Sequence, residues 1–458
     1  MDEALLLSRL QFAWVVALHI LLPAFTVGLA AYIAVLEGVF FFTRRPVFMR
    51  LSRYWLRIFA VSFGMGVVSG IVMPFQFGTN WSRFSDITAD VTGPLMAYEV
   101  LTAFFLEAGF LGILLFGREK VPAGVHFGAA ILVAAGTLLS TFWILSANSW
   151  MHTPAGYTIV DGRFVPADWL AVIFNPSFPY RLVHTTMAFF ITTAFAVIGV
   201  AAHHIRKGVH VEESLVMQKM GFGLLAILVP LQVLVGDQHG LNTLEHQPVK
   251  IAAIEANWET QAHMPLLLFA WPDEKAERNA FEIGIPDAGS LILKHSSEGV
   301  VPGLRQFKRE DRPPVAIPFF SFRLMVGIGV AMLAVTLCGL WLWYRGRLAA
   351  AHRFQALCIA AIPLGFIAVI AGWVTTEVGR QPWAVYGLLR TRDAVTPTLQ
   401  ASDVTISLLV YVAAYVLIFG SGIYFIARLA RTGFGPPQPE AQPFPRSARP
   451  MSGATRAT

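Results

Sequence analysis

The sequence predicts an all-α integral membrane protein with nine transmembrane helices. Of its 458 residues, 55% are hydrophobic and 14% are charged, and the mean hydropathy is +0.60. Soluble globular domains carry about 25% charged residues. Apolar runs near the roughly 20 residues needed to cross the hydrocarbon recur along the chain. These observations exclude a soluble protein, and the scattered basic residues behind the net charge of +6 give no nucleic-acid signal.

Nine apolar segments are expected to form the membrane-spanning helices because of their length and composition. The first follows a short polar start and is too long for a signal peptide, so it is expected to stay in the mature protein. Cys338 and Cys358 lie in separate apolar segments and form neither a disulfide framework nor a metal motif. The segments cover residues 11–41, 55–77, 94–117, 125–149, 180–205, 219–240, 319–344, 355–378 and 404–429.

Charges between the segments predict the orientation of the chain in the membrane. By the positive-inside rule, the N-terminus should lie outside and the C-terminus inside. A connection of about 78 residues, 241–318, would then lie outside, and loops this long are usually functional. We therefore expect helices one to six in 1–240, this outer loop, helices seven to nine in 319–430, and a disordered cytoplasmic tail in 431–458. Basic residues cluster after segments one, three, five and seven, at Arg44, Arg45, Arg50, Arg53, Arg118, Lys120, Arg206, Lys207, Lys219, Arg345, Arg347 and Arg353.

Several segments carry ionisable or metal-binding side chains near their expected outer ends. Such groups are costly within a membrane and face a partner, a cavity or a cofactor. One isolated His is more often a hydrogen bonder between helices than a ligand, but five segments contributing to one layer favour a cofactor. Two His, one Met and one carboxylate without clustered Cys match axial ligation of haem better than iron–sulfur or zinc sites. The residues are His19, Glu99, His184, Arg323, Met325, Glu377 and Arg380.

Four of the charged candidates have two interpretations each. Glu99 and Glu107 are eight residues apart, about 12 Å along a helix axis, and could form a proton relay or bond to neighbouring helices. Arg323 and Arg380 could pair with haem propionates or extend to the outer interface. Residue spacing alone does not decide between the two interpretations for either pair of residues.

Six sequence blocks, in this order, resemble subunit I of the cytochrome bd quinol oxidase family. The resemblance covers about residues 1–430, and it implies two four-helix bundles with one peripheral helix. The blocks are MPFQFGTNWSRFSD (Met73 to Asp86), PLMAYEVLTAFFLEAGFLGILLFG (Pro94 to Gly117), NSWM (Asn148 to Met151), QPVKIAAIEANWET (Gln247 to Thr260), SFRLMVG (Ser321 to Gly327) and GWVTTEVGRQPW (Gly372 to Trp383).

The resemblance implies three haems and their ligands. His184 and Met325 match the pair that holds a low-spin haem b. His19 and Glu377 match the ligands of the other two haems, one of b type and one of chlorin type, haem d, and which residue serves which haem stays open. Pro74 and the short outer loop are similar to the cyanide-insensitive branch, in which haem b can replace haem d.

Further roles follow from the same resemblance. Lys250 and Glu255 match residues of quinol oxidation, although they could also be a solvated charge pair. Trp373, at i and i+4 with Glu377, is similar to a tryptophan between haems. With Arg380, Glu99 and Glu107, Trp373 completes the predicted catalytic set.

The implied activity is oxidation of membrane quinol and reduction of dioxygen to water in the bacterial cytoplasmic (inner) membrane, building a proton potential without pumping. A second oxidase subunit, subunit II, is implied as heterodimer partner, and a small single-helix subunit is a further candidate. Two rival interpretations are a membrane b-type cytochrome relaying electrons between quinone and a dehydrogenase, and a secondary transporter, whose polar residues would line a substrate path.

Overall fold

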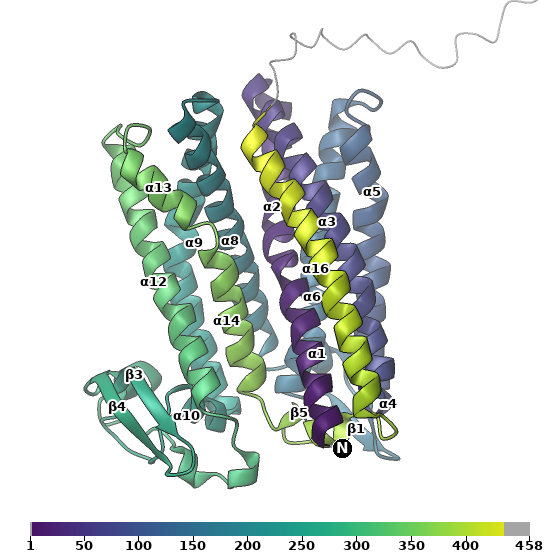
Figure 1. The fold of residues 1–458 in the computed structure, drawn as a ribbon, viewed down its shortest axis with the longest axis vertical. Coiled ribbons are helices and arrows are strands. Elements are labelled where there is room, and N and C mark those ends of the chain that lie inside the picture. Colours follow the sequence, from purple (N-terminus) through teal and green to yellow (C-terminus); the bar gives the residue numbers. More distant parts are fainter. Residues whose placement is uncertain (1, 435–458) are drawn as a thin grey trace, which may run out of the picture.

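The computed structural model describes residues 2–434. Within this range, nine helical segments are long and apolar enough to cross a membrane, which confirms the predicted number. Figure 1 shows them as a bundle of long, roughly parallel helices, with the N-terminus and the loop between α9 and α12 at one end. We call this end, which carries residues 247–315, the loop end. The last long helix finishes at the opposite end.

The spans are built from twelve α-helices and one short π-helical segment. Two of the spans are interrupted, and a third contains the π-helical segment. The number of helical elements therefore exceeds the number of spans. The elements are α1 (Asp2–Leu21), α2 (Pro23–Thr43), α3 (Pro46–Thr79), α4 (Ser82–Tyr98), η1 (Glu99–Phe104), α5 (Phe105–Phe116), α6 (Ala123–His152), α8 (Phe178–Lys207), α9 (Val211–His246), α12 (Ala316–Tyr344), α13 (His352–Ala360), α14 (Leu364–Val378) and α16 (Ala401–Thr432).

The interruptions lie where the sequence weakens the helical hydrogen bonding. Pro23 begins α2, so the first span breaks at Leu22 because Pro lacks the backbone N–H that would continue α1. Pro363 immediately precedes α14 in the eighth span. The predicted first span, 11–41, is therefore one crossing made of two helices, and it begins nine residues earlier than hydropathy alone suggests.

Helices that are distant in sequence pack together around the centre. α8, α9, α12 and α14 contact one another in a closed ring, and α13 packs on α8. α2 contacts α3, α6 and α8, which joins this ring to the rest, while α16 lies across α1 and α3. Buried residues from α2, α3, α6 and α8 form the largest apolar core cluster. The grouping into two four-helix bundles and a peripheral helix stays a prediction.

The loop end contains short elements that an all-α prediction does not include. Three antiparallel two-stranded hairpins occur in the described residues, and four short α-helices accompany them. The outer loop begins after His246 rather than at Leu241, because α9 continues further than its apolar run. These elements are β1 (Tyr157–Val160), β2 (Arg163–Pro166), α7 (Trp169–Ile173), α10 (Pro248–Ile254), β3 (Leu266–Asp273), β4 (Arg278–Ile285), α11 (Ala288–Lys294), β5 (Trp383–Val385), β6 (Leu389–Arg390) and α15 (Thr391–Ala394).

The C-terminal boundary also differs from the expected one. α16 continues to Thr432, so the start of the predicted tail, 431–458, is helical. Residues 435–458 lie outside the described residues. The side of the membrane that each end faces stays a prediction from the positive-inside rule.

Candidate functional site

The candidate residues lie at different depths along α6, which contacts several of them. His152, the last residue of α6, bonds Glu377 at the loop end. Ser140, 12 residues earlier, bonds Glu99, and Gly136, 16 residues earlier, packs against Glu107. At 1.5 Å per residue these separations are about 18 Å and 24 Å. The candidates are therefore distributed over about 24 Å, and Glu99, which was expected in one layer with Glu377, lies about 18 Å from it along α6.

Two of the residues expected near the outer ends of their segments, Glu99 and His19, lie deeper in their spans for the same reason. Glu99 does not open its helix, because the preceding residues form α4 and the span runs from Ser82 to Phe116. His19 lies near the end of α1, 17 residues after its start. Its partner Ser69 is ten residues before the end of α3, about 15 Å from the loop end. In both cases a polar stretch next to the apolar run continues the helix.

Glu377 is held by three side chains at the end of α14. Its Oε1 accepts hydrogen bonds from Asn148 Nδ2 at 3.0 Å and from His152 Nε2 at 3.2 Å. Its Oε2 pairs with Arg380 Nη2 at 2.6 Å, one turn later in sequence. Its side chain keeps 19% exposure. The carboxylate is thus fixed in direction by two helices, as a ligand to iron would need to be.

Positive charge exceeds negative charge around this carboxylate. Arg181 from α8 and Lys250 from α10 are both buried and act electrostatically on Glu377, in addition to Arg380. Burial, followed by the charge of Arg181, holds the pKa of Lys250 well below its usual value. Arg181 Nε, Arg380 Nε and Arg380 Nη1 are buried with no hydrogen-bond partner among the described residues. Two guanidinium groups with three unpartnered donors suit the binding of further carboxylates, such as haem propionates.

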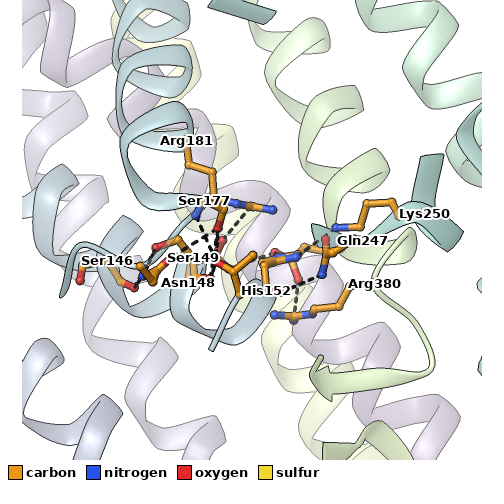
Figure 2. A network of polar contacts seen from close by, with 12 residues as sticks. Ser146, Asn148, Ser149, His152, Ser177, Arg181, Gln247, Lys250 and Arg380 are labelled. Atoms are coloured by element: carbon orange, nitrogen blue, oxygen red, sulfur yellow. Dashed lines mark hydrogen bonds and ion pairs between the residues drawn. The ribbon is translucent and has the colours of Figure 1, made fainter. Parts of the chain in front are cut away.

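Figure 2 shows that this network joins several elements at the loop end. Arg181 extends from its helix towards a group of small polar side chains that includes Ser149 and Ser177, and Lys250 and Gln247 approach His152 from the other side. Gln247 Nε2 donates to the backbone oxygen of His152 at 2.9 Å. Residues from α6, α8, α10 and α14 therefore position one another here.

His184 and Met325 belong to the same ring of four helices, on α8 and α12. The His184 ring lies against α9, where Gln232 Nε2 is 3.3 Å from both ring nitrogens and the His239 ring centroid is 5.5 Å away. The Met325 sulfur lies beside Gly372 of α14. The ring contains both proposed ligands of the low-spin haem.

Three of the four proposed axial ligands lie opposite a glycine of a neighbouring helix. A Cβ at Gly70 would be 3.3 Å from His19 Cε1, and one at Gly236 would be 3.4 Å from His184 Cε1. A Cβ at Gly372 would be 2.9 Å from Met325 Sδ. Glycine thus lets each of these three side chains pack directly against the backbone of a neighbouring helix, where a larger residue would push it away.

Arg323 and Glu255 form a pair that differs from the expected arrangement. The guanidinium of Arg323 bonds Glu255 Oε2 at 2.9 Å, Leu267 O at 2.7 Å and Ile254 O at 2.6 Å, and lies 3.6 Å from the centre of the Phe319 ring. Its main contacts join the start of α12 to the outer loop, so they favour neither a propionate partner nor a free interfacial cation. Lys250 and Glu255 do not pair with each other.

Glu99 and Glu107 lie on one continuous helical path with a π-helical turn between them. Glu99 begins η1 and accepts from Ser140 Oγ at 2.6 Å. Glu107 is buried on α5, with Gly136 against its side chain. π-Helical turns are rare and often occur at functional sites. The turn changes the angle between the two carboxyl groups from that of a regular helix.

The donor set fits haem, and the structure adds residues that the sequence motifs missed. No cluster of three or more His, Cys, Asp or Glu able to hold a metal ion occurs within residues 2–434. Cys338 and Cys358 are free. Trp373 is half-buried one turn before Glu377. The sequence motifs did not reveal the contacts of Asn148, His152, Arg181 and His239. Gln76 and Trp81 have buried polar atoms without partners in the described chain.

Comparisons with known proteins identify the family of the chain. The family model of cytochrome bd terminal oxidase subunit I matches residues 7–434. Cytochrome bd ubiquinol oxidase subunit 1 of Bacillus subtilis is 34% identical over 444 residues, with 94% of each chain covered. Cytochrome bd-II ubiquinol oxidase subunit 1 of Escherichia coli is 32% identical, with 93% of this chain and 96% of that protein covered. The structure of bd oxidase from Geobacillus thermodenitrificans matches with a TM-score of 0.86 at 30% identity, covering 94% of this chain and 99% of that chain. The chain therefore belongs to the family of cytochrome bd terminal oxidase subunit I.

Proposed function

We propose that this chain is the haem-carrying subunit of a terminal oxidase that oxidises membrane quinol and reduces dioxygen to water. It is a multi-pass protein of the bacterial inner membrane. The observation that carries the proposal is the family match over residues 7–434. Two relatives are named ubiquinol oxidase subunits and a third, 28% identical, a putative menaquinol oxidase subunit, so the substrate is stated as a membrane quinol.

Four side chains would hold the haems of this cytochrome. His184 and Met325 would bind one haem b from opposite helices of the α8, α9, α12 and α14 ring. His19 and Glu377 would each bind one of two further haems, one of b type and one haem d or a second b in its place. When bound, the haems supply the electron transfer from quinol to dioxygen. Arg181 and Arg380 would hold propionates with their unpartnered donors.

The outer loop, predicted as 241–318, would bind quinol at the loop end. Lys250 extends inward to His152, while Glu255 is fixed by Arg323 in the other direction. The two residues therefore have separate tasks. Glu255 would accept a hydrogen bond from the quinol hydroxyl, and Lys250 would donate a hydrogen bond to His152, which bonds the haem ligand Glu377. Trp373 would lie between haems.

Protons for water would reach the site along α5 and η1. Glu107 and Glu99 are successive carboxyls on this path, and the Ser140 hydroxyl beside Glu99 can both accept and donate a proton. With the N-terminus outside, quinol protons would leave at the loop end, and protons for water would enter from the cytoplasm. A proton potential would then form without a pump. Subunit II is the proposed partner, with a small single-helix subunit as a further candidate.

A spectrum and an oxygen electrode test the proposal on the complete complex purified from bacterial membranes. We expect a reduced-minus-oxidised spectrum with haem bands, and oxygen uptake when a quinol is added. A colourless complex would exclude haem and would favour a transporter. A coloured complex that consumes no oxygen would favour a b-type cytochrome that passes electrons to a partner.

A further inference from the structure

His152 connects the proposed quinol segment to a proposed haem ligand. It is the last residue of α6 and is fully buried. Lys250 Nζ lies 3.0 Å from its Nδ1, and Glu377 Oε1 lies 3.2 Å from its Nε2. The imidazole thus contacts α10 with one ring nitrogen and α14 with the other, and Figure 2 shows Lys250 reaching to it.

The chemistry of the three groups fixes the direction of this hydrogen-bond chain. A carboxylate only accepts, so the contact with Glu377 requires the N–H at Nε2. A neutral imidazole carries one N–H, and its Nδ1 must then accept. Lys250 is the donor to Nδ1. The chain therefore runs from Lys250 through His152 to Glu377, with one possible arrangement of protons.

Neighbouring contacts hold each member of the chain in place. Gln247 Nε2 donates to the backbone oxygen of His152 at 2.9 Å. A Cβ at Gly379 would lie 3.0 Å from Lys250 Cγ, so the lysine stem packs directly on the backbone two residues after Glu377. Lys250 is 2% exposed. A displacement of the lysine would therefore be transmitted to His152.

We propose that His152 is a positioning residue that couples Lys250 to the ligand carboxylate of Glu377. A hydrogen bond to a ligating group changes the basicity and orientation of that group. Mutation of such hydrogen-bond partners lowers metal affinity or activity about 10- to 100-fold. A change at Lys250 would thus alter the potential of the haem that Glu377 holds. The inference rests on the ligand role of Glu377 given under the proposed function.

Redox titration of the haem absorption bands in the purified complex tests this coupling through a double-mutant cycle. Lys250→Met should shift the potential of one haem by about tenfold in its redox equilibrium, or about 59 mV for one electron. His152→Leu should shift the same haem. In the His152→Leu background, Lys250→Met should add less than a third of its effect. Lys294→Met, an exposed lysine of the same loop, should leave all potentials unchanged.

A direct charge effect predicts a different result. If the lysine acts on the haem through space alone, Lys250→Met will give the same shift with and without His152, and the proposal is overturned. His152→Gln should preserve the coupling, because its amide can donate to Glu377 and accept from Lys250. His152→Asn, one carbon shorter, should lose it, and this pair decides the question if the Leu variant does not assemble.

The wild-type complex separates failure of this inference from failure of the proposed function. Absence of haem bands in the wild type refutes the oxidase assignment itself. Normal haem bands and oxygen uptake, together with additive effects at Lys250 and His152, refute only the coupling.

Discussion

The substitution Arg323→Met should loosen the outer loop from α12. The methionine keeps most of the aliphatic stem and removes the guanidinium that bonds Glu255, Leu267 O and Ile254 O. Glu255 is 8% exposed, so its carboxylate would be left unpaired in a buried place. Breaking a buried ion pair from one side costs about 3–5 kcal/mol. The cost falls on the closed loop, because an open loop would rehydrate Glu255.

Hydrogen exchange followed by mass spectrometry measures this loss. A decrease of about 3 kcal/mol in the free energy of local opening raises amide exchange more than a hundredfold. The effect should concentrate in residues 252–267, whose amides include that of Asn257, bonded to Ala252 O at 2.8 Å. Unchanged protection in this stretch would show that Arg323 does not hold the loop.

Arg305→Met is the matched control in the same loop. Arg305 pairs with Glu259 and Glu277, but its side chain is 45% exposed and that of Glu259 is 59% exposed. Exposed pairs contribute about 0–1 kcal/mol. The control should therefore change exchange by less than about tenfold, although it removes the same chemical group.

Three other substitutions test separate parts of the site and the fold. Glu107→Gln should slow oxygen uptake about a hundredfold while the haem bands persist. The control Glu119→Gln, at an exposed position, should have no effect, and equal rates of oxygen uptake in the two variants would exclude the relay. Gly372→Ala would place a Cβ 2.9 Å from Met325 Sδ, and it should alter the low-spin haem band by displacing that sulfur. Glu37→Gln removes a carboxylate that bonds Ser52, Arg118 and His126. The free energy of unfolding should fall by about 3 kcal/mol, so thermal unfolding of the complex should begin at a lower temperature. An unchanged profile would show that this cluster does not stabilise the fold.

The number of spans could be predicted from the sequence, because burial in lipid requires long apolar runs. The ends could not. Residues 82–93 are mostly polar, so the apolar run does not extend into them. Nevertheless α4 forms, because the helix packs Phe84, Val91 and Leu95 into a core cluster at the loop end. The depth assigned to Glu99 failed for this reason. Tertiary contacts decide where an amphipathic stretch joins an apolar one.

The candidate site was predictable where a residue is unusual for a membrane helix. Glu377 and Arg380 stand out in an apolar run, and the structure pairs them. His152 did not stand out, since it ends a helix next to a polar turn, where a histidine is common. One signal was present: Asn148 and His152 are four apart, hence on one face, and Asn148 belongs to a block that resembles the family. Only the fold reveals that this face meets Glu377.

The charge distribution at the loop end links stability to cofactor binding. Each buried donor without a partner costs about 1–3 kcal/mol, and Arg181 and Arg380 contribute three such nitrogens within the described residues. Carboxylates of a bound haem would remove this cost in the folded state only, so binding stabilises the fold according to ligand concentration and affinity. Because Asn148 and His152 join these cations to Glu377, loss of the haem should loosen α6, α10 and α14 together. The same cations that suit the site to an anionic cofactor therefore make the stability of the loop end depend on that cofactor.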